Sequence, residues 1–266
     1  MNKSVIVITG ASAGIGRECA AHLANSGWTV IGGSRRGTSN GSWRGVQLDV
    51  DRDDSVEHVF EVVDAEYGRL NAVLACAGWG LAGAAENTTL EDARAQFETN
   101  FWGVVRVVRA ALPRLREQGG GRIIVMSSIG GILGIPYQAF YSASKFALEG
   151  FVESLAYEVA PFNIQVTLVE PGNFKTDFTA ERRKVEVVGA DPYRVACDKA
   201  IAVMESDETN GADPADVARV VEKILRAKNP PRRVSVGKLD ERLGIISKRL
   251  LPFRLFEKAA KGSLGV

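Results

Sequence analysis

The chain has 266 residues, of which 45% are hydrophobic and 24% are charged, and its formal net charge is +1. This length and apolar content favour one large domain spanning 1–266. The near-neutral charge argues against a nucleic-acid-binding protein, because phosphate binding needs a concentrated basic surface. The widely spaced Cys19, Cys76 and Cys197 form no CxxC pair. Neither a disulfide framework nor a metal site is therefore predicted, and a reducing, cytoplasmic setting is favoured.

Short β-branched segments alternate with longer segments of helical periodicity. The expected strands are 5–9, 29–33, 46–49, 72–75, 122–127, 164–170 and 233–236, and the expected helices are 15–25, 53–67, 90–116, 141–160 and 214–227. Continuous apolar strands separated by helices predict an α/β fold, a doubly wound parallel sheet covered on both faces. No apolar run reaches the length that spans a bilayer, so membrane contact is not expected.

A glycine-rich turn directly follows the first strand and opens the first helix. Glycines let the backbone turn tightly and approach a pyrophosphate closely, while the free N–H groups and the helix dipole attract its negative charge. This position between a strand and a helix predicts a dinucleotide site. The residues of the turn expected to bind the cofactor are Gly10, Ser12, Ala13, Gly14, Ile15 and Gly16.

The end of the second strand bears on the choice between NAD and NADP. A carboxylate there favours NAD and an arginine favours NADP, and this chain has Arg35 and Arg36. Two guanidinium groups can hold a 2′-phosphate by bidentate hydrogen bonds, so NADP is the predicted cofactor. The alternative is a solvated basic turn. Asp49 and Val50, after the third strand, are expected beside the adenine.

Tyr141 and Lys145 lie four residues apart near the start of a long predicted helix, so both side chains project from one face. A nearby ammonium group would lower the pKa of the tyrosine by favouring phenolate. Ser128 lies thirteen residues upstream, just past an apolar strand, and Asn100 lies in an earlier helix. The hydroxyl of Ser128 is predicted to hold a substrate oxygen while Tyr141 exchanges its proton.

The ordered set of the glycine turn, Asn100, Ser128, Tyr141-x-x-x-Lys145 and Pro171-Gly172 resembles the compact, one-domain branch of the short-chain dehydrogenase/reductase family, which has a Rossmann fold. The resemblance covers roughly 5–176. It implies that Tyr141 is the acid/base, that Lys145 also binds the nicotinamide ribose, and that Asn100 holds a proton-relay water. It further implies cofactor contacts from Ala77, Gly78, Pro171, Gly172 and Thr176.

One position departs from the family pattern, which has Asn-Ala-Gly after the fourth strand. This chain has Cys76-Ala77-Gly78, so an amide side chain is missing. Cysteine is a poor hydrogen-bonding residue, and whatever the amide ties together must be satisfied otherwise or be looser. We interpret Cys76 as a small buried residue rather than a redox group.

The segments 140–150 and 169–176 are similar to those of family members that act on hydroxysteroids and retinoids. A lipophilic ketone, aldehyde or secondary alcohol is therefore the predicted substrate, and a 3-oxoacyl thioester is the alternative. A catalytically silent dinucleotide-binding regulatory protein is the alternative from another class. The side chains expected around the substrate are Trp79, Leu81, Ile132, Leu133, Ile135, Tyr137, Phe174 and Phe178.

Two further regions are expected to complete the domain. The long mixed stretch 173–210 is predicted to be a substrate loop with helical pieces, in which 182–184 form a solvated basic face. The basic amphipathic segment 238–266 is predicted to be a flap or subunit contact rather than a membrane anchor, because Pro252 interrupts it. The apolar helix 141–160, with Phe146, Leu148, Phe151, Leu155 and Val159, predicts a homodimer or homotetramer, since the family commonly pairs this helix.

Overall fold

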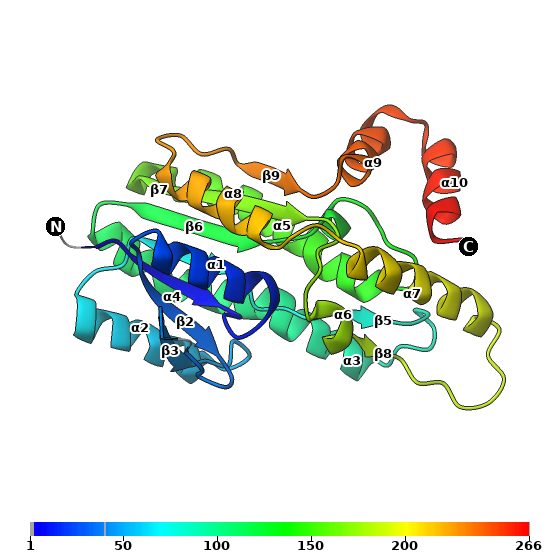
Figure 1. The fold of residues 1–266 in the computed structure, drawn as a ribbon, viewed down its shortest axis with the longest axis horizontal. Coiled ribbons are helices and arrows are strands. Elements are labelled where there is room, and N and C mark those ends of the chain that lie inside the picture. The colour runs from blue at the N-terminus through cyan, green and yellow to red at the C-terminus, as the bar shows by residue number, and fades with distance from the viewer. Residues whose placement is uncertain (1–2, 40, 266) are drawn as a thin grey trace.

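Seven parallel strands form the central sheet of the computed structural model, which describes residues 3–39 and 41–265 (Figure 1). The strands are β1 (Val5–Thr9), β2 (Thr29–Ser34), β3 (Arg44–Gln47), β4 (Ala72–Ala75), β6 (Gly121–Met126), β7 (Ile164–Pro171) and β9 (Arg233–Val236). All seven predicted strands are present, with bounds shifted by two residues at most. Val266, the last residue of the expected flap, lies outside the described residues.

The strand order is β3-β2-β1-β4-β6-β7-β9, so successive strands run outward from β1 in one direction and from β4 in the other. In such sheets the crevice at the carboxyl ends of the strands, where the order reverses, is the usual ligand site. The predicted doubly wound α/β fold is confirmed, and it places the candidate site at the carboxyl ends of β1 and β4.

Helices cover both faces of the sheet (Figure 1). They are α1 (Gly14–Asn25), α2 (Asp53–Tyr67), α3 (Leu90–Phe97), α4 (Gly103–Glu117), α5 (Ala139–Glu158) and α8 (Ala215–Arg226). One apolar cluster lies under α2, α4 and α5, and a second lies under α1 and α8. Along β1, Val5 and Val7 join the first cluster while Ile6 and Ile8 join the second. This alternation explains why the first four positions of the strand are all apolar.

The predicted helix 90–116 is interrupted. A π-helical turn, Glu98–Trp102, separates α3 from α4. The extra residue in such a turn rotates the following side chains, and π turns recur at functional sites. The single-helix prediction was wrong in this respect, and the deviation falls on Asn100, one of the predicted site residues.

The stretch 173–210 contains more regular structure than a loop. It holds the short helix α6 (Phe178–Glu181), the two-residue strand β8 (Arg183–Lys184), and the sixteen-residue helix α7 (Arg194–Thr209). β8 pairs with β5 (Leu81–Ala82), which anchors the region to the chain after β4. After it, the side chain of Asp213 accepts a hydrogen bond from the N–H of Ala215, the first residue of α8.

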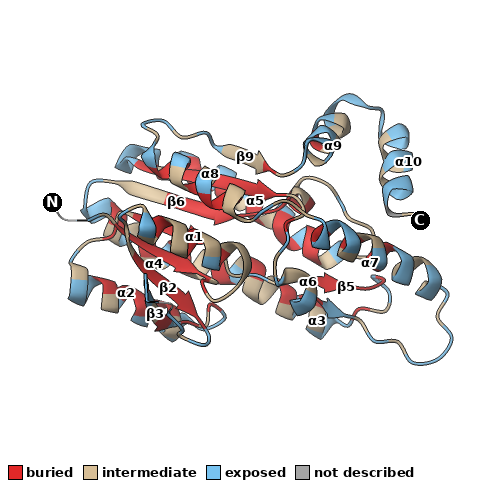
Figure 2. Ribbon diagram, in the orientation of Figure 1, coloured by how far each residue is buried: buried red, intermediate tan, exposed pale blue. Residues whose placement is uncertain are grey.

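The chain ends in two helices, α9 (Leu239–Leu250) and α10 (Phe253–Leu264), which stand beside the main body and are largely exposed (Figure 2). Pro252 separates them, as expected. No helix in the described ranges is both long and apolar enough to cross a bilayer. On α5, Leu148, Leu155 and Val159 are buried in the core, so the sequence argument that these three face a partner was wrong.

Candidate active site

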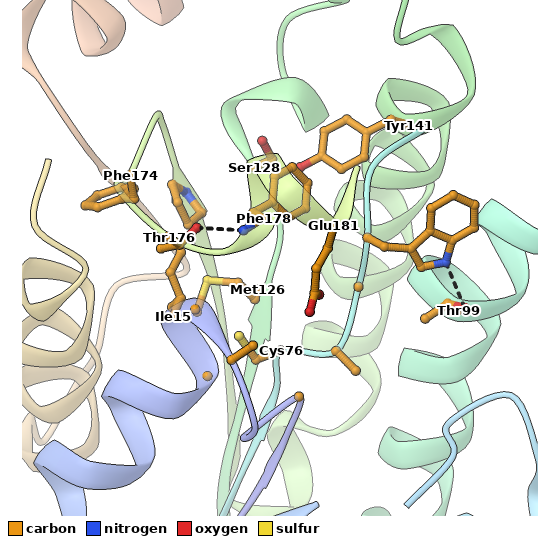
Figure 3. A pocket seen from close by; sticks show the side chains of 18 of the residues that line it. Ile15, Cys76, Thr99, Met126, Ser128, Tyr141, Phe174, Thr176, Phe178 and Glu181 are labelled. Atoms are coloured by element: carbon orange, nitrogen blue, oxygen red, sulfur yellow. Dashed lines mark hydrogen bonds between the residues drawn. The ribbon is translucent and has the colours of Figure 1, made fainter. Parts of the chain in front are cut away.

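A single pocket at the carboxyl edge of the sheet brings the predicted residues together (Figure 3). The predicted residues that line it are Gly10, Ser12, Ala13, Gly14, Ile15, Gly16, Arg35, Asp49, Val50, Ala77, Gly78, Ser128, Tyr141, Lys145, Pro171, Gly172 and Thr176. Only Arg36 and Asn100 of the predicted set are absent from the lining, and each contacts a residue that belongs to it. Segments that are distant in the sequence therefore share one cavity.

The glycine turn adopts a backbone that other residues would strain. Gly10 and Gly14 have φ angles of +71° and +51°, in the left-handed region. A Cβ atom at Gly16 would collide with the carbonyl oxygen of Gly10, so the first turn of α1 packs directly on the loop. No acidic residue lies in that turn, and its N–H groups face the pocket end. The glycine turn and the start of α1 therefore fit a pyrophosphate.

Two arginines lie beside the glycine turn. The guanidinium of Arg36 donates to the hydroxyl of Ser12 at 3.2 Å, and Arg35 lines the pocket. Neither forms an ion pair with any carboxylate in the described part of the chain. Both cations are thus positioned to bind a phosphate next to the turn.

Ser128, Tyr141 and Lys145 meet where β6 ends and α5 begins. Tyr141 and Lys145 are buried, and the hydroxyl of Tyr141 points toward Ser128 in Figure 3. Ser128 Oγ accepts a hydrogen bond from the N–H of Gly130 at 3.0 Å, which fixes its orientation. The ammonium of Lys145 lies 5.9 Å from the centre of the Tyr141 ring and donates to the carbonyl of Met126 at 2.9 Å.

The electrostatics of this group differ from the sequence expectation. Burial raises the pKa of Tyr141, and the nearby hydroxyl of Ser128 opposes this shift. The ammonium is directed at the Met126 carbonyl rather than at the phenol, which explains the difference. Burial also lowers the pKa of Lys145 to about 8. The expected net lowering of the Tyr141 pKa was wrong for this structure, because burial outweighs the effects that lower it.

Asn100 lies outside the pocket lining and holds two segments of the pocket together by hydrogen bonds. It is fully buried in the π-helical turn. Its Oδ1 accepts from the N–H of Trp79 at 3.0 Å, and its Nδ2 donates to the Trp79 carbonyl at 3.0 Å and to Ser144 Oγ at 3.3 Å. These bonds fasten the segment after β4 to α5. The implied role in holding a relay water stays a prediction.

The hydroxyl of Thr9 binds the segment after β4, in which this chain lacks the family's asparagine. Its hydroxyl oxygen accepts from the N–H groups of both Cys76 and Ala77, each at 3.0 Å. The segment after β4 is therefore held to the end of β1 without an amide side chain. Burial raises the pKa of the Cys76 thiol to about 12, so the thiol stays protonated near neutral pH. Cys76 is only partly buried and lines the pocket, so the expectation of a buried residue was wrong, although a protonated thiol does not suit a redox role.

Thr9→Val keeps the volume of the side chain but leaves two N–H groups without an acceptor. We expect it to lower the free energy of unfolding by about 1–3 kcal/mol in urea titrations. Thr29→Val, at a partly buried position on β2 for which no side-chain hydrogen bond to another described residue is found, is the matched control. Equal stability of the two variants would contradict the role of Thr9.

Several lining residues escaped the sequence analysis. Arg182, predicted to be solvated, is buried and forms an ion pair with Glu208, which also accepts from the Thr179 hydroxyl at 2.6 Å. Glu208, Glu181 and Met204 all line the pocket. No local pattern marks a pair that lies 26 residues apart, and only the packing of α6 on α7 creates it.

The predicted substrate-facing set is only partly correct. The members that line the pocket are Trp79, Ile135, Phe174 and Phe178, and the members that do not are Leu81, Ile132, Leu133 and Tyr137. Leu81 is buried in β5, and Tyr137 packs against a separate apolar cluster with Ala200 and Met204.

A buried carboxyl group lies one helical turn beyond Lys145. Glu149 accepts a hydrogen bond from the hydroxyl of Ser127 and forms an ion pair with Arg233 at 2.9 Å. Burial raises the pKa of Glu149 from 4.5 to about 7, with Arg233 and Lys145 opposing the shift and Glu170 adding to it. The acid is therefore largely protonated below neutral pH.

The raised pKa of Glu149 makes stability depend on pH. The folded chain binds a proton that the unfolded chain has released between pH 4.5 and about 7, so folding loses stability as the pH rises through this window. Glu149→Gln removes the titrating group and should therefore remove that loss. Between pH 4.5 and about pH 7, the free energy of unfolding of the variant should rise relative to that of the parent by up to about 3 kcal/mol. Urea unfolding across this range measures it. The control is Glu153→Gln, because Glu153 is an exposed neighbour that also pairs with Arg233. If the free energy of unfolding changes with pH equally in both variants, the prediction is contradicted.

Comparison with known proteins places this fold and site in a family. Residues 4–187 match the family model described as short chain dehydrogenase. The chain is 42% identical over 263 residues to 3-ketodihydrosphingosine reductase of Bacteroides thetaiotaomicron, which covers 98% of both chains. It is 35% identical over 250 residues to retinol dehydrogenase 8 of Bos taurus, covering 86% of this chain and 80% of the relative. The crystal structure of a short-chain dehydrogenase from Streptomyces avermitilis superposes with a TM-score of 0.83 at 33% identity and covers 98% of each chain.

The chain belongs to the short-chain dehydrogenase/reductase family. It is accordingly an oxidoreductase that acts on CH–OH groups, built as one domain on the nucleotide-binding fold of that family. The resemblance found in the sequence motifs is confirmed.

Proposed function

We propose that the protein is an NADP-dependent oxidoreductase that moves hydride between nicotinamide and a lipophilic ketone, aldehyde or secondary alcohol. The observation that carries the proposal is one pocket lined by the glycine turn, Arg35, Ser128, Tyr141 and Lys145. A regulatory protein that only binds a dinucleotide has no need of the last three, so the enzyme is preferred to the silent alternative.

In this proposal each side chain has a separate task. When bound, the nicotinamide supplies or accepts the hydride. Ser128 Oγ holds the substrate oxygen, and Tyr141, protonated at neutral pH because burial raises its pKa, donates its phenolic proton to that oxygen in the reducing direction. Lys145 is assigned to the ribose hydroxyls, and its buried charge stabilises the phenolate left on Tyr141.

NADP is the proposed cofactor because the end of β2 offers cations and no carboxylate. A 2′-phosphate at this position would meet Arg35 and Arg36 directly, whereas the 2′-hydroxyl of NAD would leave both unpaired. The contacts assigned to the rest of the dinucleotide are Asp49 and Val50 at the adenine, the turn 10–16 at the pyrophosphate, and Ala77, Gly78, Pro171, Gly172 and Thr176 around the nicotinamide end.

Replacing Arg35 and Arg36 together by alanine should weaken NADPH binding tenfold or more and leave NADH binding nearly unchanged, because charged hydrogen bonds are worth about 1.5–3 kcal/mol. Fluorescence titration of both dinucleotides gives the two dissociation constants. Arg109→Ala, on the exposed surface of α4, is the control. Equal affinity of the unmodified protein for NADPH and NADH would refute the cofactor assignment.

A lipophilic substrate is supported by the apolar part of the lining. Trp79, Ile135, Phe174, Phe178 and Met204 face the same cavity as Ser128 and Tyr141. The names of two relatives state a keto derivative of dihydrosphingosine and retinol as substrates. We propose that the region 173–210 closes over such a compound. A panel of ketones, aldehydes and 3-oxoacyl thioesters, followed by NADPH oxidation, distinguishes this class from the thioester alternative.

We further propose a cytoplasmic homodimer or homotetramer. The exposed aromatic side chains Trp102, Phe146 and Tyr157 lie on the π-helical turn and on α5, and supply apolar surface for pairing through these helices. The three free cysteines fit a reducing compartment.

Tyr141→Phe should bind NADPH almost normally while kcat falls at least a hundredfold, the usual scale for loss of a general acid/base. Ser128→Ala should also spare NADPH binding and lower kcat/KM by roughly a hundredfold or more, by analogy with loss of one oxyanion donor. Steady-state turnover on a substrate from the panel, beside the dissociation constant for NADPH, tests both. Tyr157→Phe, on the exposed face of the same helix, is the control. Near-normal turnover of Tyr141→Phe would mean that Tyr141 is not the proton donor.

A further inference from the structure

A stripe of exposed aliphatic side chains runs along α9. Leu239, Leu243, Ile246 and Leu250 recur at steps of four, three and four residues, which places them on one face of the helix. Their exposed fractions are 70%, 52%, 50% and 76%. The opposite face is used inside the molecule, because Ile245 is buried and Glu241 accepts hydrogen bonds from the N–H groups of Lys238 and Asn173. The helix is therefore docked through one face and uncovered on the other (Figure 2).

The apolar surface continues past the end of α9. Leu251 and Phe253 are 41% and 74% exposed, and Pro252 between them starts α10. The exposed side chains from Leu239 to Phe253 belong to consecutive turns of one short region. Contiguous apolar surface of this kind marks an interaction site in a soluble domain.

The charge of this region indicates what covers it. The segment 239–265 holds six basic and three acidic residues, although the whole chain carries a net charge of only +1. Arg242, Arg249, Arg254 and Lys258 are exposed, and none has a carboxylate partner in the described part of the chain. Cations that flank an apolar stripe are the pattern of helices that lie in the interface of an anionic membrane.

Two of these cations also share a recess with the stripe. Arg242 and Arg249, seven residues apart, line a shallow cavity between α9 and β9, together with Ile246. Arg233 lines it as well, but its charge is compensated by Glu149 and Glu153, and the carboxylate of Glu170 in the same lining accepts from the Ser235 hydroxyl at 2.6 Å. Arg242 and Arg249 are thus the cations left for an external anion at the side of the apolar stripe.

The position of α9 links this surface to the pocket. Lys248 donates to the carbonyl of Ile132, and Glu241 accepts from the N–H of Asn173. These bonds fasten α9 to the loops after β6 and β7, which supply Ser128 and Gly172 to the pocket lining. A membrane on the exposed face of α9 would therefore lie against a helix that is bound to two loops of the pocket.

We propose that α9 and the start of α10 form a membrane-docking element, with the aliphatic stripe inserted at the headgroup boundary of an anionic bilayer and Arg242 and Arg249 bound to lipid phosphates. The element lies on the membrane and does not span it. This inference goes beyond the proposed reaction. Its test requires no turnover, so the membrane proposal and the proposed reaction can each fail independently.

The test is flotation of the full-length protein with vesicles of phosphatidylcholine alone or with about a third phosphatidylglycerol, at low and high salt. We expect binding to the anionic vesicles at low salt, weakened by high salt. The double variant Leu243→Ser and Leu250→Ser should reduce the partition coefficient at least tenfold, and Arg242→Gln with Arg249→Gln roughly thirtyfold. The exposed pair Leu90→Ser and Val195→Ser, outside the element, is the control and should bind like the parent.

Failure of the parent to float with anionic vesicles would overturn the proposal, as would unchanged flotation of the stripe variant. Light scattering of the parent and the stripe variant completes the test. A lower mass for the stripe variant would show that a second copy of the chain covers the stripe, and would also overturn the proposal. Circular dichroism melting confirms that each variant is folded.

Discussion

Parallel pairing of β1, β4, β6 and β7 is the constraint on which the site depends. Because the carboxyl ends of parallel strands meet at one edge, Gly10, Ala77, Ser128 and Pro171 become neighbours although they are spread over most of the sequence. The approach is close: a Cβ atom at Gly10 would lie 3.0 Å from the backbone of Ala77. The hydrogen bonds from the segment after β4 to Thr9 hold these two loops at that distance.

Burial then sets the protonation of the groups carried by α5. Tyr141, Lys145 and Glu149 follow one another at steps of four residues, so they form a line from the pocket toward Arg233 on β9. Desolvation favours the neutral form of each, raising the pKa of the tyrosine and the glutamate and lowering that of the lysine. One helix face thereby supplies a phenol that stays protonated and an ammonium group that loses its proton near pH 8.

What could be predicted from the sequence was encoded locally. Most of the seven strands are short apolar runs, and the glycine turn and Tyr141-x-x-x-Lys145 each lie within one loop or one helix. The missed features depend on contacts between distant segments or on small changes in helix geometry. Apolar periodicity cannot distinguish a π-helical turn at Asn100 from a regular helix, and nothing near Arg182 announces Glu208 on α7. The hydroxyl of Thr9 reaches the segment after β4 only because β1 and β4 are paired.

The central claim is that hydride passes between NADPH and the carbonyl carbon of a lipophilic compound in this pocket. Incubation with NADPH deuterated at either face of C4, followed by mass spectrometry of the alcohol, measures that transfer directly. The account predicts one deuterium at the carbinol carbon from one labelled face and none from the other. An alcohol without deuterium from either label, or no alcohol from any lipophilic ketone or aldehyde in the panel, would contradict it.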